Sequence, residues 1–141
     1  MLKVFDMMTP NPVTVSEDAP LKTVWNLMKQ EGHPQLPVVN AQGELTGIIT
    51  DRDLRLAINS PYVLHERQDD ERLLETLTAL GMMSSNPVTV TPDAPACKAA
   101  EILGERKFGA LPVTEGNYVV GIISVTDFLA QFIAERCREL G

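Results

Sequence analysis

The sequence predicts an α+β fold built from two copies of one β-α-β-β-α unit. Residues 7–20 return as residues 82–95 with ten of fourteen positions identical, at a shift of 75. Further along, residues 47–53 return as residues 121–127 at a shift of 74, so a turn of the second copy has lost one residue. Two copies fill a chain of 141 residues, which argues against a solenoid or propeller. We place repeat 1 at residues 1–68 and repeat 2 at 69–141.

The first strand and helix of repeat 1 follow from local pattern. Residues 12–15 (PVTV) are typical of a short β-branched strand, and Asp18 is placed to cap a helix whose first turn accepts Pro20. Gly32 is a typical helix stop. Apolar residues recur within this helix at i, i+3, i+4 and i+7, which predicts one apolar face formed by Leu21, Val24, Trp25 and Met28.

The rest of repeat 1 reads as a hairpin followed by a second helix. Residues 35–39 form an apolar run typical of a buried strand, and the turn residues 40–43 lead into a second strand at 45–50. A helix then begins near Asp51 and ends before Pro61.

Repeat 2 has the same order of elements. We expect a strand at 88–90, a helix at 95–107, and strands at 110–113 and 118–124 around a turn at 115–117. The final helix is amphipathic and longer than its counterpart, so its apolar side covers either the neighbouring copy or a second subunit. That side carries Phe128, Leu129, Phe132 and Ile133, and the polar side carries Gln131, Glu135 and Arg138.

The segments that precede each repeat complete the element list. Residues 60–70 are polar and loop-like, and residues 71–82 read as a short helix leading into repeat 2. Residues 3–8 are expected to mirror that helix. The two methionine pairs, Met7–Met8 and Met82–Met83, are expected to fill irregular gaps under these segments.

Composition narrows the function classes. A hydrophobic fraction of 44% with 22% charged residues is ordinary for a globular protein. The formal charge of −7 argues against general nucleic-acid binding and against anionic membranes, so only a local cationic patch would support a phosphate ligand. The apolar run at 119–123 is too short to span a bilayer, and residues 1–8 lack a signal-peptide core. We therefore expect a soluble, cytoplasmic protein.

The metal-ligating residue types are sparse and scattered. Cys97 and Cys137 occupy unrelated places in the two repeats, and His33 and His65 are the only histidines. This pattern predicts neither a metal site nor a disulfide framework. Catalytic motifs of the Ser-His-Asp, P-loop and dinucleotide-binding types are also missing from the sequence, so we expect the chain not to be an enzyme.

Three motifs recur in order: Met-x-x-x-Pro-Val-Thr-Val, then Leu-Pro-Val, then Gly followed by two apolar residues and Thr/Ser-x-x-Asp. The series resembles a tandem pair of CBS domains, named after cystathionine β-synthase and often called a Bateman module. The resemblance covers almost the whole chain. It implies a regulatory module whose repeats pack by pseudo-twofold symmetry through their sheets, with two clefts that hold adenosine-containing ligands in many relatives.

The third motif has a chemistry of its own at a strand-to-helix turn. Thr50 and Ser124 place a hydroxyl at the first turn of a helix, where unpaired N–H groups and the macrodipole favour an anion. Asp53 and Asp127 follow three residues later, and a carboxylate suits the paired hydroxyls of a ribose. The same spacing is also that of a capping box, which begins many helices that bind nothing. Both interpretations remain open from the sequence. Gly47 and Gly121 allow another segment to approach the strand closely.

The two motifs differ in charge. Arg52 and Arg55 follow the first motif on its helix, whereas Thr126 and Leu129 occupy the matching places after the second. Because arginine offers a bidentate fork for phosphate oxygens, we expect a phosphate to prefer the first motif.

The resemblance also implies where an adenine base would be held. It points to residues near the first strand and at the entry to the second, and packing or turn geometry explains the same residues equally well. In repeat 1 these are Val13, Thr14, Pro34 and Gln35; in repeat 2 they are Val88, Thr89, Gly109 and Ala110.

The sequence thus predicts a stand-alone CBS-pair sensor that binds AMP, ADP, ATP or S-adenosylmethionine as a regulatory ligand, requires no cofactor, forms a homodimer and signals to an unknown effector protein. The alternative is a ligand-free dimerisation or interaction module in which both Thr/Ser-x-x-Asp motifs act only as helix caps.

Overall fold

The computed structural model describes residues 1–58 and 77–137, which form two compact units. The first-copy unit is Val13–Pro87, and the second-copy unit joins Met1–Pro12 to Val88–Gly141. The polar segment expected at 60–70, the first half of the helix expected at 71–82 and the boundary between residues 68 and 69 lie outside the described residues. No helix within the described ranges is long and apolar enough to cross a membrane.

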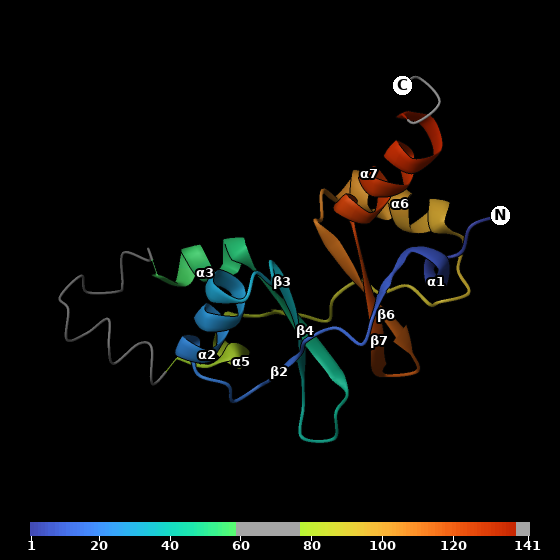
Figure 1. Cartoon of the computed structure of the whole chain (residues 1–141). Helices are drawn as coiled ribbons and strands as arrows, with labels where there is room; N and C mark the ends of the chain where they lie inside the picture. Colours follow the sequence, from blue (N-terminus) through green and yellow to red (C-terminus); the bar gives the residue numbers. More distant parts are fainter. Residues whose placement is uncertain (59–76, 138–141) are drawn as a thin grey trace. The chain divides into compact units, whose positions relative to one another are not determined.

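The first-copy unit contains a four-stranded sheet of order β2-β3-β4-β5 (Figure 1). β2 runs parallel to β3, and the other two pairings are antiparallel. The strands are β2 (Val15–Ser16), β3 (Gln35–Val39), β4 (Leu45–Thr50) and β5 (Ser84–Ser85). The helices lie to one side of the β3–β4 hairpin: α2 (Leu21–Trp25), which continues as the π-helical turn η1 (Asn26–Gln30), α3 (Asp51–Ile58) and α5 (Ala79–Met82).

The second-copy unit repeats this plan. Its sheet has the order β1-β7-β6, and Val90 bridges Val113 in parallel, so Val90 takes the place that β2 has in the other unit. The strands are β1 (Thr9–Pro10), β6 (Ala110–Glu115) and β7 (Tyr118–Ser124). The helices are α1 (Val4–Met7), α6 (Ala96–Arg106) and α7 (Val125–Phe132), which continues as the π-helical turn η2 (Ile133–Cys137). The predicted α+β class is confirmed.

The segments that lead into the repeats are exchanged between the units. Residues 1–12 precede repeat 1 but pair through β1 with β7, and residues 77–87 precede repeat 2 but pair through β5 with β4. The two segments, called the leading segments below, make matched backbone hydrogen bonds. Val4 N–H donates to the Ala94 carbonyl at 2.9 Å, and Ala79 N–H donates to the Ala19 carbonyl at 2.8 Å. Each unit therefore combines parts of both sequence repeats.

Each unit has its own hydrophobic core, and matched positions build both. The strands contribute fully buried side chains to each core, because their apolar residues face the helices that cover the sheet. In the first-copy unit these are Leu36, Val38 and Ile49, and in the second-copy unit Leu111, Val113 and Ile123.

Most predicted elements are confirmed within one or two residues, including both hairpins and the helix starts at Asp51 and Ala96. Gly32 has a φ of 77°, as expected for a helix stop, and Lys107 takes the same left-handed place with a φ of 56°. The first strands are shorter than predicted: β2 spans only two residues, and only Val90 of residues 88–90 joins the sheet. The short helix expected at 3–8 is α1.

Two predictions about α2 are wrong. Pro20, not Asp18, occupies the N-cap position, and it provides no side-chain cap. Asp18 lies too far before the helix and instead accepts a hydrogen bond from the Ser16 hydroxyl. Trp25 does not share the buried face, since its side chain is 37% exposed. The buried ridge of Leu21, Val24 and Met28 excludes it because Trp25 lies about 100° further round the helix than Val24.

A methionine contacts a glycine at the junction of each leading segment with its sheet. A Cβ atom at Gly47 would stand 2.8 Å from Cγ of Met83 and 2.9 Å from the Ser84 carbonyl oxygen. A Cβ at Gly121 would stand 3.1 Å from Cγ of Met8 and 3.1 Å from the Thr9 carbonyl oxygen. The expected close approach at these glycines is confirmed, and the approaching groups are the leading segments.

Candidate ligand-binding turns

The turn between β4 and α3 forms a closed network of hydrogen bonds. The Thr50 backbone N–H donates to Oδ2 of Asp53 at 2.9 Å, and the Thr50 hydroxyl donates to the same oxygen at 3.1 Å. The Asp53 N–H donates back to Oγ1 of Thr50 at 3.3 Å. This reciprocal arrangement is a capping box with aspartate in place of glutamate.

The turn between β7 and α7 repeats the network with serine. The Ser124 N–H and hydroxyl reach Oδ2 of Asp127 at 2.8 and 3.1 Å, and the Asp127 N–H reaches Oγ of Ser124 at 3.3 Å. The capping role is therefore present in both units. In each turn the hydrogen bonds among the described residues use Oδ2, so the second carboxylate oxygen remains available to a ligand hydroxyl.

The entry to the preceding strand lies beside each turn. Gln35 is the register partner of Thr50, and the Asp51 N–H donates to the Pro34 carbonyl at 3.2 Å. In the second-copy unit Ala110 is the partner of Ser124. There the Val125 N–H donates to the Gly109 carbonyl at 3.0 Å. The structure thus brings together the hydroxyl, the carboxylate and the strand-entry residues that the sequence singled out.

The residues before the first strand approach the same end of the sheet. Val15 pairs in parallel with Val38, so Val13 and Thr14 precede the ladder on the side where β3 begins. Val13 is 39% exposed, and Thr14 is half-buried. In the second-copy unit Val88 packs against the core, which supports its interpretation as a packing residue, while Thr89 is exposed.

Charge distinguishes the two turns, but only one of the two arginines that follow the first motif remains available to a phosphate. Arg55 is engaged, because its Nε lies 3.4 Å from Oδ2 of Asp51. Lys29 on η1 lies 2.5 Å from Oδ1 of the same carboxylate. The hydrogen bond from Lys29, with the positive charges of Lys29 and Arg55, lowers the pKa of Asp51 although partial burial opposes the shift. Arg52 is exposed and makes no ion pair within the described residues, so it is the cation beside the first turn that remains available to a phosphate.

Sequence reasoning missed the role of Lys29. A signal was present in the comparison of the repeats, because three members of the cluster differ together: Lys29, Asp51 and Arg55 correspond to Gly104, Val125 and Leu129. The Lys29 ammonium also lies 5.9 Å from the centre of the Trp25 ring, within cation–π range. Trp25 in turn corresponds to Ala100, so the whole surface cluster belongs to the first-copy unit alone.

Comparison with known proteins gives a consistent family. The sequence model of the CBS domain matches residues 4–60 and 77–133. A CBS domain-containing protein of Dictyostelium discoideum is 32% identical over 127 residues, which cover 89% of this chain and 88% of that protein. The homoserine O-acetyltransferase of Methanococcoides burtonii is also 32% identical, but the match covers only 23% of that enzyme.

Solved structures of similar chains have the same fold. The AcuB protein of Vibrio cholerae aligns with a TM-score of 0.80 and 32% identity, over 99% of this chain and 95% of that one. The CBS domain pair of protein MJ0100, in complex with 5′-methylthioadenosine and S-adenosylmethionine, has a TM-score of 0.81, 22% identity and coverage of 96% and 99%. CBSX2 in complex with AMP has a TM-score of 0.78, 23% identity and coverage of 95% and 98%.

Proposed function

Since the chain belongs to the CBS-domain family and carries a tandem pair of these domains, we propose that it is a regulatory module that binds an adenosine-containing ligand. One observation carries the proposal: each unit presents a hydroxyl and a carboxylate together at a strand-to-helix turn, beside a strand entry. The CBS domain pair of protein MJ0100 is solved with 5′-methylthioadenosine and S-adenosylmethionine, and CBSX2 is solved with AMP. AMP, ADP, ATP and S-adenosylmethionine are therefore the ligands to test.

The residues of each turn have distinct roles in this proposal. Asp53 and Asp127 accept hydrogen bonds from ribose hydroxyls through the carboxylate oxygen that the cap leaves available. Thr50 and Ser124 offer hydroxyls to a phosphate or carboxylate at the helix start. The base packs against Val13, Thr14, Pro34 and Gln35 in one unit and against Val88, Thr89, Gly109 and Ala110 in the other.

A phosphate-bearing ligand binds the first-copy turn in preference to the second. Arg52 supplies a guanidinium there, whereas Thr126 follows the second turn. The second-copy turn offers Ser124, Thr126 and Asp127 and has Thr126 and Leu129 at the places of Arg52 and Arg55, which suits a ligand without phosphate, such as S-adenosylmethionine. Binding regulates a partner only where the ligand has different affinities for two arrangements of the protein, because equal affinity shifts no population.

Calorimetry with the four ligands tests the proposal. Asp53→Ala should abolish or weaken binding at the first-copy turn, and Asp127→Ala at the second. Matched controls exist in both units: Asp18 and Asp93 also accept a hydrogen bond from a nearby hydroxyl, but neither lies in a candidate turn. Asp18→Ala and Asp93→Ala should leave binding unchanged. Binding that survives both turn substitutions would remove Asp53 and Asp127 from the proposed sites.

A second candidate is a ligand-free dimerisation or interaction module. Two observations favour it: both turn carboxylates already serve as caps, and the C-terminal helix carries a row of exposed apolar side chains. These are Leu129, Phe132 and Ile133, each more than half exposed. A ligand that binds only the folded state must raise the melting temperature. Uniformly unchanged melting temperatures with all four ligands, together with a dimer in light scattering, would favour this candidate.

We propose no catalytic step for the chain. We also propose that it forms a homodimer and that it signals to an effector protein. Turnover of AMP or ATP by the purified protein, abolished by Asp53→Ala, would contradict the non-catalytic assignment. Packing of the repeats through their sheets stays a prediction.

A further inference from the structure

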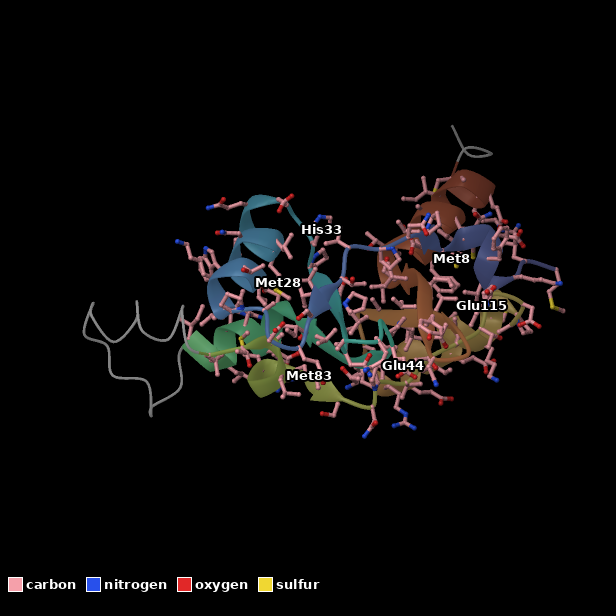
Figure 2. The ribbon with its side chains drawn as sticks, turned by 90° about the horizontal axis from the view of Figure 1, so that it is seen from below. Met8, Met28, His33, Glu44, Met83 and Glu115 are labelled. Atoms are coloured by element: carbon pink, nitrogen blue, oxygen red, sulfur yellow. The ribbon has the colours of Figure 1, made fainter. Side chains whose placement is uncertain are left out.

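The two leading segments are held to their sheets by one kind of side-chain contact. Met8 corresponds to Met83 at the shift of 75, and Gly121 corresponds to Gly47 at the shift of 74. In both units the methionine sulfur is the atom nearest to the place where a Cβ on the glycine would stand. Figure 2 labels both methionines, Met8 beside the ribbon of α1 and Met83 beside that of α5. These contacts are called the methionine–glycine pairs below.

Each pair depends on an apolar sulfur that packs against a strand at a glycine, where no side chain is in the way. Gly47 and Gly121 are buried, and the methionines pack against the two cores. A thioether is apolar and a weak hydrogen-bond acceptor, so it loses little on leaving water. Val4 and Ala79 anchor the helical part of each leading segment through buried side chains and backbone hydrogen bonds, but only two residues of each segment pair with the sheet. The methionine–glycine pair is therefore the side-chain contact at the strand part of the segment.

The polarity of these sulfurs therefore bears on how firmly the strand part of each segment is held. We propose that Met8 and Met83 make the fold sensitive to peroxide, because conversion of either thioether to a sulfoxide releases its leading segment. The sulfur attacks one oxygen of hydrogen peroxide, the O–O bond breaks, the sulfur gains that oxygen, and the other oxygen leaves as water. Sulfur is oxidised by two electrons and the peroxide is reduced. The product is polar, and its oxygen is a strong acceptor that favours water over a contact with glycine and the core.

Partial exposure together with the glycine contact distinguishes Met8 and Met83 from the other methionines of the chain. Met8 and Met83 are half-buried, which leaves a path for a small oxidant. Met28 and Met82 are only 6% and 8% exposed, and Met1 is fully exposed but packs against nothing that oxidation would disturb. Met7 is half-buried and packs against the same core as Met8, but Met8 is the methionine nearest to Gly121, so Met7 separates oxidation beside the core from oxidation at the glycine.

Release of a segment changes the connection between the units. The chain passes from the second-copy unit to the first-copy unit between residues 12 and 13, and it passes back between residues 87 and 88. The chain thus passes between the units at the end of each leading segment. Freeing residues 1–12 leaves the units joined at residues 87 and 88 alone, and freeing residues 77–87 lengthens that junction.

Hydrogen exchange with mass spectrometry tests the proposal on the intact chain. After hydrogen peroxide treatment, amides in residues 2–12 and 77–87 should exchange about tenfold faster, and methionine sulfoxide reductase should restore the original rates. Met8→Leu should remove the response of residues 2–12 alone, and Met83→Leu that of residues 77–87 alone. Met7→Leu and Met82→Leu should leave both responses intact.

Protein with norleucine in place of every methionine keeps the unbranched side-chain shape without sulfur, so it separates oxidation from packing if a leucine variant folds poorly. It should not respond to peroxide. Two results would overturn the proposal: Met8 and Met83 converted to sulfoxide with unchanged exchange, or both unmodified when Met1 is fully oxidised. A response that persists in the norleucine protein would overturn it as well.

Discussion

The two strand-to-helix turns share one hydrogen-bond network but have different electrostatic surroundings. The bond lengths of the Thr50–Asp53 and Ser124–Asp127 networks agree within 0.1 Å at each of the three matched bonds. Around them, the ion-pair cluster of Lys29, Asp51 and Arg55 in one unit corresponds to uncharged residues in the other.

This difference shows that hydrogen bonding constrains the residues at a helix start more tightly than the residues on the outer helix surface. Each turn must satisfy the orphan N–H groups at the start of its helix, and a half-buried strand end allows few solutions, so both copies have the same one. The outer helix surfaces face no such requirement and have diverged. The capping network therefore explains why the two turns share one geometry, whereas the unequal charges predict which ligand each turn prefers.

The largest expected effect concerns the leading segments, where the two units are almost equal. Gly47→Ala and Gly121→Ala should each destabilise the protein by about 1–3 kcal/mol, because the new methyl group collides with methionine and backbone. Gly47→Ala should cost more, since its Cβ would stand 2.9 Å from the Ser84 carbonyl oxygen against 3.1 Å from the Thr9 carbonyl oxygen at Gly121. Urea denaturation measures both values.

Gly104→Ala is the matched control for these substitutions. Nothing lies within 4 Å of a Cβ at Gly104, which occupies the interior of α6. Alanine there should stabilise the protein by about 0.5–1 kcal/mol, through helix propensity. Equal costs at Gly47 and Gly104 would contradict the role given to the methionine–glycine pairs.

The next effect tests whether the two capping networks are energetically equal. Thr50→Ala and Ser124→Ala should each cost about 1 kcal/mol, because each removes the side-chain acceptor of an N-terminal helix N–H. Ser16→Ala also removes a hydroxyl that bonds an aspartate, but it caps no helix and should cost about 0.5 kcal/mol or less. Thermal unfolding gives the differences, and unequal losses at Thr50 and Ser124 would show that the surroundings alter the cap.

Local pattern predicted most elements because strands and helices here obey short-range rules. The strand that follows the turn at 40–43, the stop at Gly32 and the Thr/Ser-x-x-Asp turns needed no information from distant parts of the chain. The predictions for Asp18 and Trp25 were wrong for reasons that are also local. The Ser16 hydroxyl competed for Asp18, and Trp25 satisfied the apolar spacing while lying at the edge of the buried face.

The exchange of the leading segments is beyond local pattern. Residues 2–12 and 77–87 are identical at five of eleven positions, including both methionines, and either sheet offers the same glycine and the same strand edge to both. Which segment pairs with which sheet depends on loop closure over the whole chain, and the composition of either segment does not reveal it. The ion pair between Lys29 and Asp51 joins residues 22 apart, so local pattern did not predict it either.

The smallest expected effect compares two aspartates whose pKa values are lowered for different reasons. The hydrogen bond from the Lys29 ammonium is the main cause at Asp51, whereas the Thr91 hydroxyl and the backbone N–H of Asp93 itself are the main causes at Asp93. A lowered folded-state pKa means that each carboxylate stabilises the protein above the unfolded value of 3.8, and that this contribution is lost as the pH falls through the lowered value.

Salt should distinguish the two aspartates. Asp51→Asn and Asp93→Asn should each lower the melting temperature slightly at pH 6, and both differences from the unsubstituted protein should shrink below about pH 4. In 1 M NaCl at pH 6 the difference should shrink for Asp51→Asn and persist for Asp93→Asn, because mobile ions screen an exposed ion pair more than a hydrogen bond to a hydroxyl or an N–H. Equal salt sensitivity of the two variants would mean that the charged cluster contributes nothing specific to the first-copy unit.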